Sequence, residues 1–362
     1  MTNAKNEAIA VHDRVRFWLP DPEGRLTAAR LYQEVQGEQR LLEMARHDGG
    51  FELWLDRPAV RRMEYVFDVT HADGSTTREL DPGNDVDIDG VFGRKSVIEF
   101  PGYQAPHWLD EGAEPVDPVE LAVESDWLAA AVPVRLWHAP GTPPDQPLPL
   151  LVVHDGYEFE TYSSITTWAA AAVAHGWVRP FRLALLHPVE RIGWYSANPA
   201  YADTLVREVL PAIIEAAPID ERPALMGASL GALAALHAHL LHPGIFSGLF
   251  LQSGSFFTEL PPGREVSLHA IPPFMADVHA AAVLAEPVPT VLTVGVIERN
   301  LANVRRMVTT LSARGYDVHL HEMPDGHNYT AWRDALDPHL TGLLARLWNT
   351  NAANREVESA HR

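Results

Sequence analysis

Short segments in which apolar and polar residues alternate dominate the first hundred residues. Apolar side chains occupy every second position in residues 15–19 and again in residues 63–69, and an Asp-Gly turn follows at 73–74. A period of two buries one face of a strand and leaves the other face in solvent. Several such strands with turns between them predict a small antiparallel, immunoglobulin-like β-sandwich over residues 1–116. Further strands are expected at 30–35, 51–55 and 96–100.

The pattern changes after residues 101–117, which are rich in proline, glycine and acidic side chains. Continuous apolar runs such as LPLLVVH (148–154) replace the alternation, and helical patterns separate these runs. Such an order is typical of an α/β domain whose mostly parallel sheet is covered by helices on both faces, here over residues 117–348. A polar tail follows at 349–362. The expected strands are 119–125, 132–137, 148–154, 183–187, 224–227, 247–252, 290–295 and 318–323, and the expected helices are 166–174, 201–217, 230–241, 301–314 and 329–348.

The composition narrows the functional classes. The 362 residues are 46% hydrophobic, which excludes a disordered chain. A net charge of −20 disfavours a nucleic-acid partner, because binding to phosphates needs clustered cations. The absence of cysteine excludes disulfide scaffolds, thiolate zinc sites and cysteine nucleophiles.

Two segments bear on membranes and export. The amino terminus, MTNAKNEAIAVHDRV, has no apolar core and does not match a secretory signal. Residues 223–258 are uncharged, but they contain three histidines and divide into a helix-like and a strand-like part. We interpret them as buried α/β structure rather than a membrane span, and we expect a soluble, cytoplasmic protein.

The strongest chemical signal is the sequence Gly-Ala-Ser-Leu-Gly at 227–231, placed directly between an apolar strand and an alanine-rich helix. A turn this sharp strains its central residue, and its flanking positions leave no room for side chains. The pattern predicts that Ser229 is the exposed nucleophile of an α/β-hydrolase.

A serine nucleophile needs a base and an acid that orients the base, and in α/β-hydrolases they follow in the order acid, then histidine. His327 lies in the loop after the last expected strand, which predicts that it is the base. Glu298 follows the preceding strand and is the predicted acid, with Asp325 as the alternative. The predicted oxyanion donors are the amide of Leu230 and one from the loop at 155–157, either Gly156 or, as we favour, Tyr157.

Four stretches together resemble the esterase D superfamily, and within it the enterochelin (enterobactin) esterases. They are LVVHDGYEF (151–159), RIGWYSANPAYADTLVREVLP (191–211), GASLGALAALHAHLLHPGIFSGLFLQSGSFF (227–257) and DGHNYTAWRDAL (325–336). DPGN (81–84) and FGRKSVIEFPGY (92–103) look like that family's leading domain. Many members have glycine where this chain has Ala232, and aspartate where it has Asn328.

The resemblance implies hydrolysis of ester bonds in the cytoplasm, in its best-known members the trilactone of ferric catecholate siderophores. It also suggests that Arg191, which lies after the strand at 183–187, binds a catecholate or carboxylate of the substrate. Trp194, Trp332 and Tyr157 are candidate pocket walls. No cofactor is expected, since any iron would arrive with the substrate.

Other functions stay open. Feruloyl, acetyl or general acyl ester hydrolysis and acyl transfer would use the same residues. A binding protein on a hydrolase scaffold is the non-enzymatic alternative. The pairs His237/His239 and His319/His321 suggest a metallohydrolase, but residues two apart on a helix point to different sides, and we predict no metal site.

Overall fold

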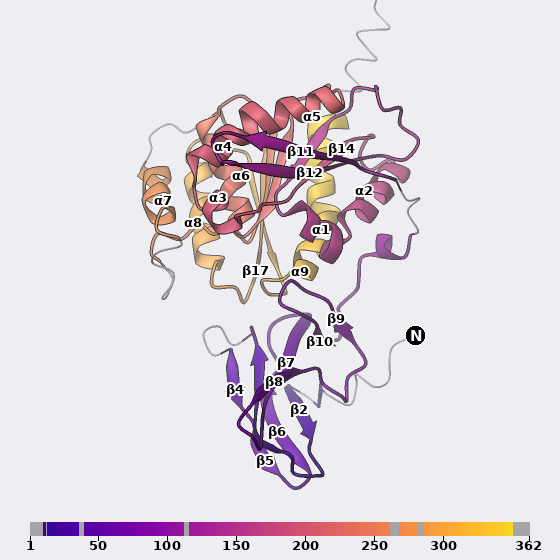
Figure 1. Cartoon of the computed structure of the whole chain (residues 1–362), viewed down its shortest axis with the longest axis vertical. Helices are drawn as coiled ribbons and strands as arrows, with labels where there is room; N and C mark the ends of the chain where they lie inside the picture. Colours follow the sequence, from indigo (N-terminus) through magenta and orange to yellow (C-terminus); the bar gives the residue numbers. More distant parts are fainter. Residues whose placement is uncertain are drawn as a thin grey trace, which may run out of the picture. The chain divides into compact units, whose positions relative to one another are not determined.

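The computed structural model describes residues 10–11, 13–35, 40–111, 116–260, 268–280 and 286–349. These residues form two compact units, whose ribbons are drawn in Figure 1. The N-terminal unit takes its residues from 1–104 together with 295–299 and 323–331, and the α/β unit takes the others. Two loops of the second half of the chain thus belong with the first unit.

The N-terminal unit consists of two antiparallel sheets with a shared core, which confirms the predicted sandwich. Val15, Phe17 and Leu19 of one sheet pack in the same buried cluster as Leu31 and Phe67 of the other. One sheet has the order β1 (Ala10–Val11), β2 (Arg14–Pro20), β6 (Gly50–Asp56) and β5 (Ala45–His47). The other has the order β4 (Leu41–Glu43), β3 (Leu26–Gln33), β7 (Arg62–His71), β10 (Lys95–Glu99) and β9 (Asp87–Ile88), with β8 (Thr76–Glu79) beside β7.

The α/β unit contains an eight-stranded mixed sheet. Its order is β11 (Val119–Ser125), β12 (Ala130–His138), β14 (Arg182–Leu186), β13 (Leu150–Val153), β15 (Ala224–Ala228), β16 (Gly248–Gln252), β17 (Thr290–Gly295) and β18 (Val318–Met323). The pairs β11–β12 and β12–β14 are antiparallel, and the pairs from β14 to β17 are parallel. The mostly parallel sheet predicted from the apolar runs is confirmed.

The last strand, β18, also runs parallel to its neighbour. The amide of Thr290 donates to the carbonyl of Asp317 at 2.9 Å, and further along the amide of Val296 donates to Met323 at 2.8 Å. Both strands therefore advance in the same direction. The carboxyl ends of β13, β15, β16, β17 and β18 consequently lie at the same edge of the sheet.

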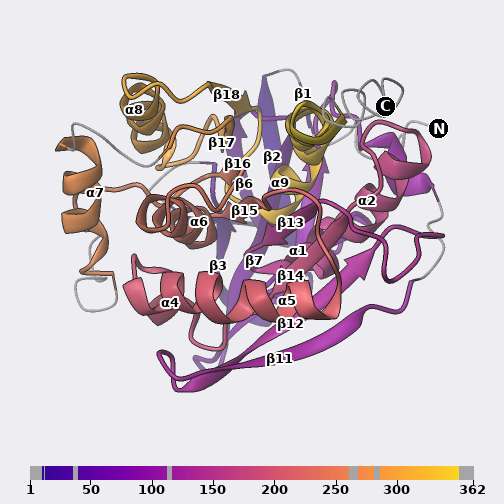
Figure 2. The ribbon, with the colours of Figure 1, turned by 90° about the horizontal axis from the view of Figure 1, so that it is seen from above.

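Helices cover both faces of this sheet, as Figure 2 shows for α6 and α8 on one side and α1 and α2 on the other. The first face carries α4 (Pro199–Thr204), α5 (Leu210–Ala216), α6 (Leu230–Leu241), α7 (Ile271–Ala280) and α8 (Leu301–Ser312). The second face carries α1 (Gly156–Ser163), α2 (Ile165–Ala174) and the helical residues 341–349. Shorter helical elements are η2 (His107–Asp110), α3 (Arg191–Tyr195), α9 (Tyr329–Asp334) and η4 (Leu336–Leu340).

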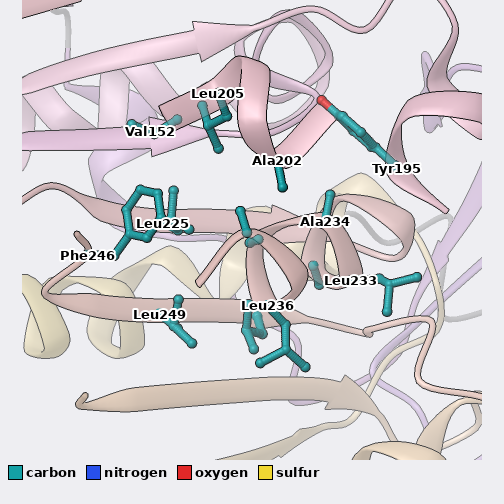
Figure 3. Close-up of a cluster of buried hydrophobic side chains, with 14 of the residues drawn as sticks. Val152, Tyr195, Ala202, Leu205, Leu225, Leu233, Ala234, Leu236, Phe246 and Leu249 are labelled. Carbon is teal, nitrogen blue, oxygen red and sulfur yellow. The ribbon is translucent and has the colours of Figure 1, made fainter. Parts of the chain in front are cut away.

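The core beneath α6 fixes the position of that helix. Leu233 and Leu236 of α6 lie in one buried cluster with Leu225 of β15 and Leu249 of β16, and Figure 3 shows these side chains gathered between the helix and the strands. Burial of each leucine contributes on the order of 2 kcal/mol. Because α6 begins directly after Ser229, this packing also fixes the start of the helix relative to the end of β15.

Two predicted helices are interrupted in the structure. The helix expected at 201–217 contains a π-helical turn, η3 (Leu205–Val209), before α5, whose second residue is Pro211. Proline has no amide proton to continue an α-helical bond pattern. The helix expected at 329–348 is broken at Asp337, whose non-helical φ and ψ fit the restriction on a residue before proline.

No helix among the described residues has the length and apolar character needed to cross a membrane.

Candidate active site

Ser229 occupies a strained turn between β15 and α6. Its φ is 55° and its ψ is −117°, a backbone conformation that residues other than glycine rarely adopt. A Cβ on Gly227 would overlap the carbonyl of Gly231, and a Cβ on Gly231 would lie 3.1 Å from the carboxylate of Asp155. The structure therefore has the sharp strand-to-helix turn that the motif predicts, with glycine required at position 227 and little space for a Cβ at position 231.

The loop after β16 holds this turn in place. The amide of Ser229 donates to the carbonyl of Gln252 at 2.9 Å, and the amide of Ser255 donates to the carbonyl of Ser229 at 3.1 Å. The hydroxyl oxygens of Ser229 and Ser255 lie 3.4 Å apart. Ser255 was not singled out in the sequence, because a Ser-Gly-Ser segment after a strand has no distinctive signature.

Glu298 and His327 are directly hydrogen-bonded. Nδ1 of His327 lies 2.7 Å from Oε2 of Glu298, and Oε1 of Glu298 accepts from the amide of Gly295 at 2.7 Å. The glutamate side chain is 2% exposed, whereas the imidazole is 34% exposed. A buried carboxylate on Nδ1 favours the tautomer in which Nδ1 carries the proton and Nε2 is a proton acceptor. The structure thus brings together the predicted acid and base.

The alternative acid, Asp325, has other partners. Its Oδ1 accepts from the amide of Gly326 at 2.6 Å and from Nδ2 of Asn328 at 3.0 Å, and its Oδ2 lies 3.6 Å from Nη1 of Arg62. Its carboxylate therefore shapes the turn that leads into His327, while Glu298 bonds the imidazole itself. Asn328, one of the departures from the family pattern, takes part in this turn.

The candidate oxyanion donors are at the starts of two helices. Gly156 and Tyr157 are the first residues of α1, and Leu230 is the first residue of α6. The first amides of an α-helix have no carbonyl partner within the helix and carry its positive dipole end. A Cβ on Gly156 would overlap Leu185 of β14, so only glycine allows α1 to approach the sheet this closely.

The two helix starts are also adjacent. The position of a Cβ on Gly231 lies 3.1 Å from both His154 and Asp155, the residues that precede α1. The amide of His154 donates to the carbonyl of Met226 in β15 at 2.9 Å. The three predicted donor amides are therefore carried by neighbouring segments of the α/β unit. The role of each amide stays a prediction.

Asp155 and Arg191 form a pair that the sequence did not reveal. Nε and Nη2 of Arg191 donate to the two carboxylate oxygens of Asp155 at 2.7 and 2.6 Å. Asp155 is 1% exposed and has a φ of 55° at the start of α1. The guanidinium thus neutralises a buried carboxylate beside the candidate oxyanion donors. Its predicted contact with substrate stays a prediction.

The candidate aromatic wall residues have partners within the α/β unit. Trp194 is buried and stacks on Tyr201, and Nε1 of the buried Trp332 donates to Oγ of Ser253 at 2.9 Å. The hydroxyl of Tyr157 donates to Glu120 at 3.1 Å. These contacts fix the three rings in place, and their role as pocket walls stays a prediction.

The histidines considered as metal ligands have other neighbours. Nε2 of His239 lies 2.9 Å from the hydroxyl of Tyr316, and His237 packs edge-on against Phe274. Burial lowers the pKa of His237 and of His239 to about 4. Within the described ranges, no three acidic or histidine side chains are grouped so that they could hold a metal ion.

We expect Gly227→Ala to destabilise the protein, because its Cβ would overlap backbone atoms of Gly231. A loss of about 1–3 kcal/mol or more in the free energy of unfolding is expected from such overpacking. Gly342→Ala is the control, because its Cβ would meet nothing within 4 Å in a helical segment. It should be neutral or stabilising by up to about 1 kcal/mol. Urea unfolding measures both variants, and equal stabilities would contradict the steric requirement at the turn.

The chain is similar to known esterases in sequence and in fold. The model of the esterase family, described as "Putative esterase", matches residues 132–343, more than half of the chain. The iron(III) enterobactin esterase of Dickeya dadantii (strain 3937) is 27% identical over 261 residues, which cover 65% of this chain. The chain spans 58% of the length of that relative.

Solved structures share the fold. The enterobactin esterase of Shigella flexneri, determined in the presence of enterobactin, superposes with a TM-score of 0.75 at 20% identity, over 94% of this chain and 95% of that one. The ferric enterobactin esterase of Salmonella typhimurium superposes with a TM-score of 0.74 at 22% identity, over 92% of this chain and 93% of that one. A ferulic acid esterase superposes with a TM-score of 0.54 at 17% identity, over 64% of this chain and 98% of that one. With the α/β-hydrolase fold, the strained serine turn and the family match over residues 132–343, the chain belongs to the esterase family.

Proposed function

We propose that this chain hydrolyses carboxylic esters, with Ser229 as nucleophile, His327 as general base and Glu298 as the acid that orients it. The observation that carries the proposal is the 2.7 Å bond between Glu298 and Nδ1 of His327, in loops that follow β17 and β18. Ser229 follows β15, a parallel strand of the same sheet. In open α/β sheets, ligands bind at the carboxyl ends of the strands, where these three loops begin.

In the proposed reaction, Nε2 of His327 removes the proton of the Ser229 hydroxyl as Oγ attacks the ester carbonyl. The imidazolium then protonates the leaving alcohol, and an acyl-enzyme remains. A water molecule activated by the same imidazole attacks the acyl-enzyme and releases the acid. Glu298 stabilises the imidazolium and keeps Nδ1 protonated.

The negative charge that develops on the carbonyl oxygen needs preorganised donors. We assign this role to the amide of Leu230 at the start of α6 and to that of Tyr157 or Gly156 at the start of α1. Loss of one such donor typically costs about 2.7–4 kcal/mol of transition-state stabilisation. The Asp155–Arg191 pair would keep the start of α1 in position for this task. The reaction needs no metal or organic cofactor.

We propose that the substrate is an enterobactin-type trilactone and that the enzyme acts on it in the cytoplasm. The support is the sequence similarity to the iron(III) enterobactin esterase of Dickeya dadantii. Arg191, Trp194 and Trp332 are the proposed substrate-binding residues. Feruloyl, acetyl or general acyl esters, and transfer to an alcohol instead of water, are the alternatives. A non-catalytic binding role would leave the Glu298–His327 pair without a purpose.

Mass spectrometry of the products identifies the substrate class. We expect ferric and iron-free tri-catechol lactones to be opened to linear catechol-serine esters faster than feruloyl or simple acyl esters are hydrolysed. The reaction is run with and without a small alcohol, so that alkyl ester products report acyl transfer. Faster turnover of feruloyl esters than of both lactones would contradict the trilactone proposal and leave the esterase proposal intact.

Ser229→Ala and His327→Ala should each abolish hydrolysis of p-nitrophenyl acyl esters, by about 10³-fold or more, because each removes one half of the nucleophile–base pair. The absorbance of released p-nitrophenol measures the rate. Circular dichroism and the thermal midpoint serve as controls that the fold is unchanged. Retention of most of the activity in either variant would refute the mechanism.

Glu298→Gln should lower kcat by about 10²–10⁴-fold, because an amide nitrogen facing Nδ1 favours the wrong imidazole tautomer. The KM for a p-nitrophenyl ester should change little, since the carboxylate is buried behind the imidazole. Steady-state kinetics separate the two constants. An unchanged kcat would show that Glu298 does not orient the base.

A further inference from the structure

Both loops that carry the acid–base pair are attached to the N-terminal sandwich. Val296 and Ile297, just before Glu298, pack against the buried core between the two sheets. The amide of Arg61, just before β7, donates to the carbonyl of Pro324 at 2.7 Å. The loops are also joined to each other, since Val296 donates to Met323 at 2.8 Å. The loops that carry Glu298 and His327 are therefore both attached to the sandwich, through Val296, Ile297 and Pro324.

A buried ion pair strengthens the second attachment. Arg62, the first residue of β7, is 3% exposed, and its Nη1 lies 3.6 Å from Oδ2 of Asp325. Its Nη2 lies 3.8 Å from Glu64, and its guanidinium carbon lies 5.4 Å from the ring centre of Tyr103. The positive charge of Arg62 is thus held at a fixed place beside Asp325, which lies two residues before His327 in the chain.

The charged form of Asp325 is unfavourable in the folded protein. The pKa of Asp325 is raised to about 6, because burial and, less strongly, the charge of Glu64 raise it more than Arg62 and the bonds from Asn328 and Gly326 lower it. A carboxyl group whose pKa is raised by folding stabilises the fold when it is neutral, and this stability is lost as the pH rises through about 6. At neutral pH the ionised group therefore costs stability. Glu34 and the Lys95–Glu64 pair complete the charged surroundings of the small cavity beside it.

We propose that the N-terminal sandwich is a scaffold for catalysis, in which Arg62 and Asp325 are positioning residues that hold the His327 loop in its reactive geometry. The inference rests on the proposed function, because it gives a role to the surroundings of the proposed base. Buried ion pairs contribute little to stability and can instead select one geometry. Catalytic groups need placement within about 0.5 Å, which a loop achieves only when its support is rigid.

Four variants test this proposal on p-nitrophenyl acetate at pH 8. We expect Arg62→Met and Asp325→Asn to lower kcat by about 10–100-fold with a KM changed less than about threefold, because the nucleophile and the substrate contacts remain. Arg62→Lys should recover part of kcat, since it keeps a charge. Arg78→Met is the matched control: Arg78 pairs with Asp68, which lies six residues further along β7, about 20 Å away at the rise of a strand. It should keep kcat within about twofold.

The thermal midpoint distinguishes positioning from a merely structural role. At pH 8, Asp325→Asn removes a buried carboxylate whose ionisation costs stability, but it also takes a charge partner from the buried guanidinium of Arg62. These two effects oppose each other, so the midpoint should change little while kcat falls. A structural role would move both quantities in the same direction. If Arg62→Met does not fold, Asp325→Asn and Arg62→Lys still decide the result.

Two outcomes separate the scaffold proposal from the esterase proposal. In the first outcome, the wild-type protein hydrolyses the ester and Ser229→Ala is inactive, but kcat of Arg62→Met and of Asp325→Asn equals that of Arg78→Met. This result would overturn the scaffold proposal alone. Ester hydrolysis that persists in Ser229→Ala would overturn the proposed function, and the scaffold proposal with it.

Discussion

The hydrogen bond between Glu298 and His327 is the interaction on which the proposed chemistry depends. A carboxylate that is 2% exposed is stable only with strong donors, and those of Glu298 include the imidazole and the amide of Gly295. The imidazole therefore has one favoured tautomer and one favoured orientation, and Nε2 is left as the proton acceptor. Because Gly295 ends β17, the orientation of the imidazole is tied to the end of that strand.

The serine turn imposes the second constraint, and it does so through space rather than charge. Ser229 has a positive φ at a junction where β15 and α6 meet so closely that a Cβ on Gly227 would overlap backbone atoms of Gly231. The leucines of α6 bury enough apolar surface to hold the helix in this position. The strain at one residue is thus supported by the packing of an entire helix, and the same packing sets the direction of the Leu230 amide.

Local patterns were enough to predict most of the fold and the contact between Glu298 and His327. The helix at 230–241 and the strands at 290–295 and 318–323 have the predicted limits, because their apolar runs end at glycines, prolines or polar residues. Glu298 could be placed from its position after β17. The pairs Asp155–Arg191 and Arg62–Asp325 could not be predicted, since their members are 36 and 263 residues apart (191 − 155 and 325 − 62) and charged residues are common in loops. Only the folded chain shows which charges meet.

These two pairs share a physical logic. Each buries a carboxylate directly before a segment with a proposed role, Asp155 before the amides of α1 and Asp325 before His327, and each places a guanidinium on that carboxylate. The bidentate pair of Asp155 has short bonds, whereas the Arg62 contact is longer and the pKa of Asp325 is raised to about 6. The second pair is therefore the weaker one in free energy. A buried ion pair that contributes little stability and still lies beside the proposed base is better explained by the geometry it imposes than by the stability it provides.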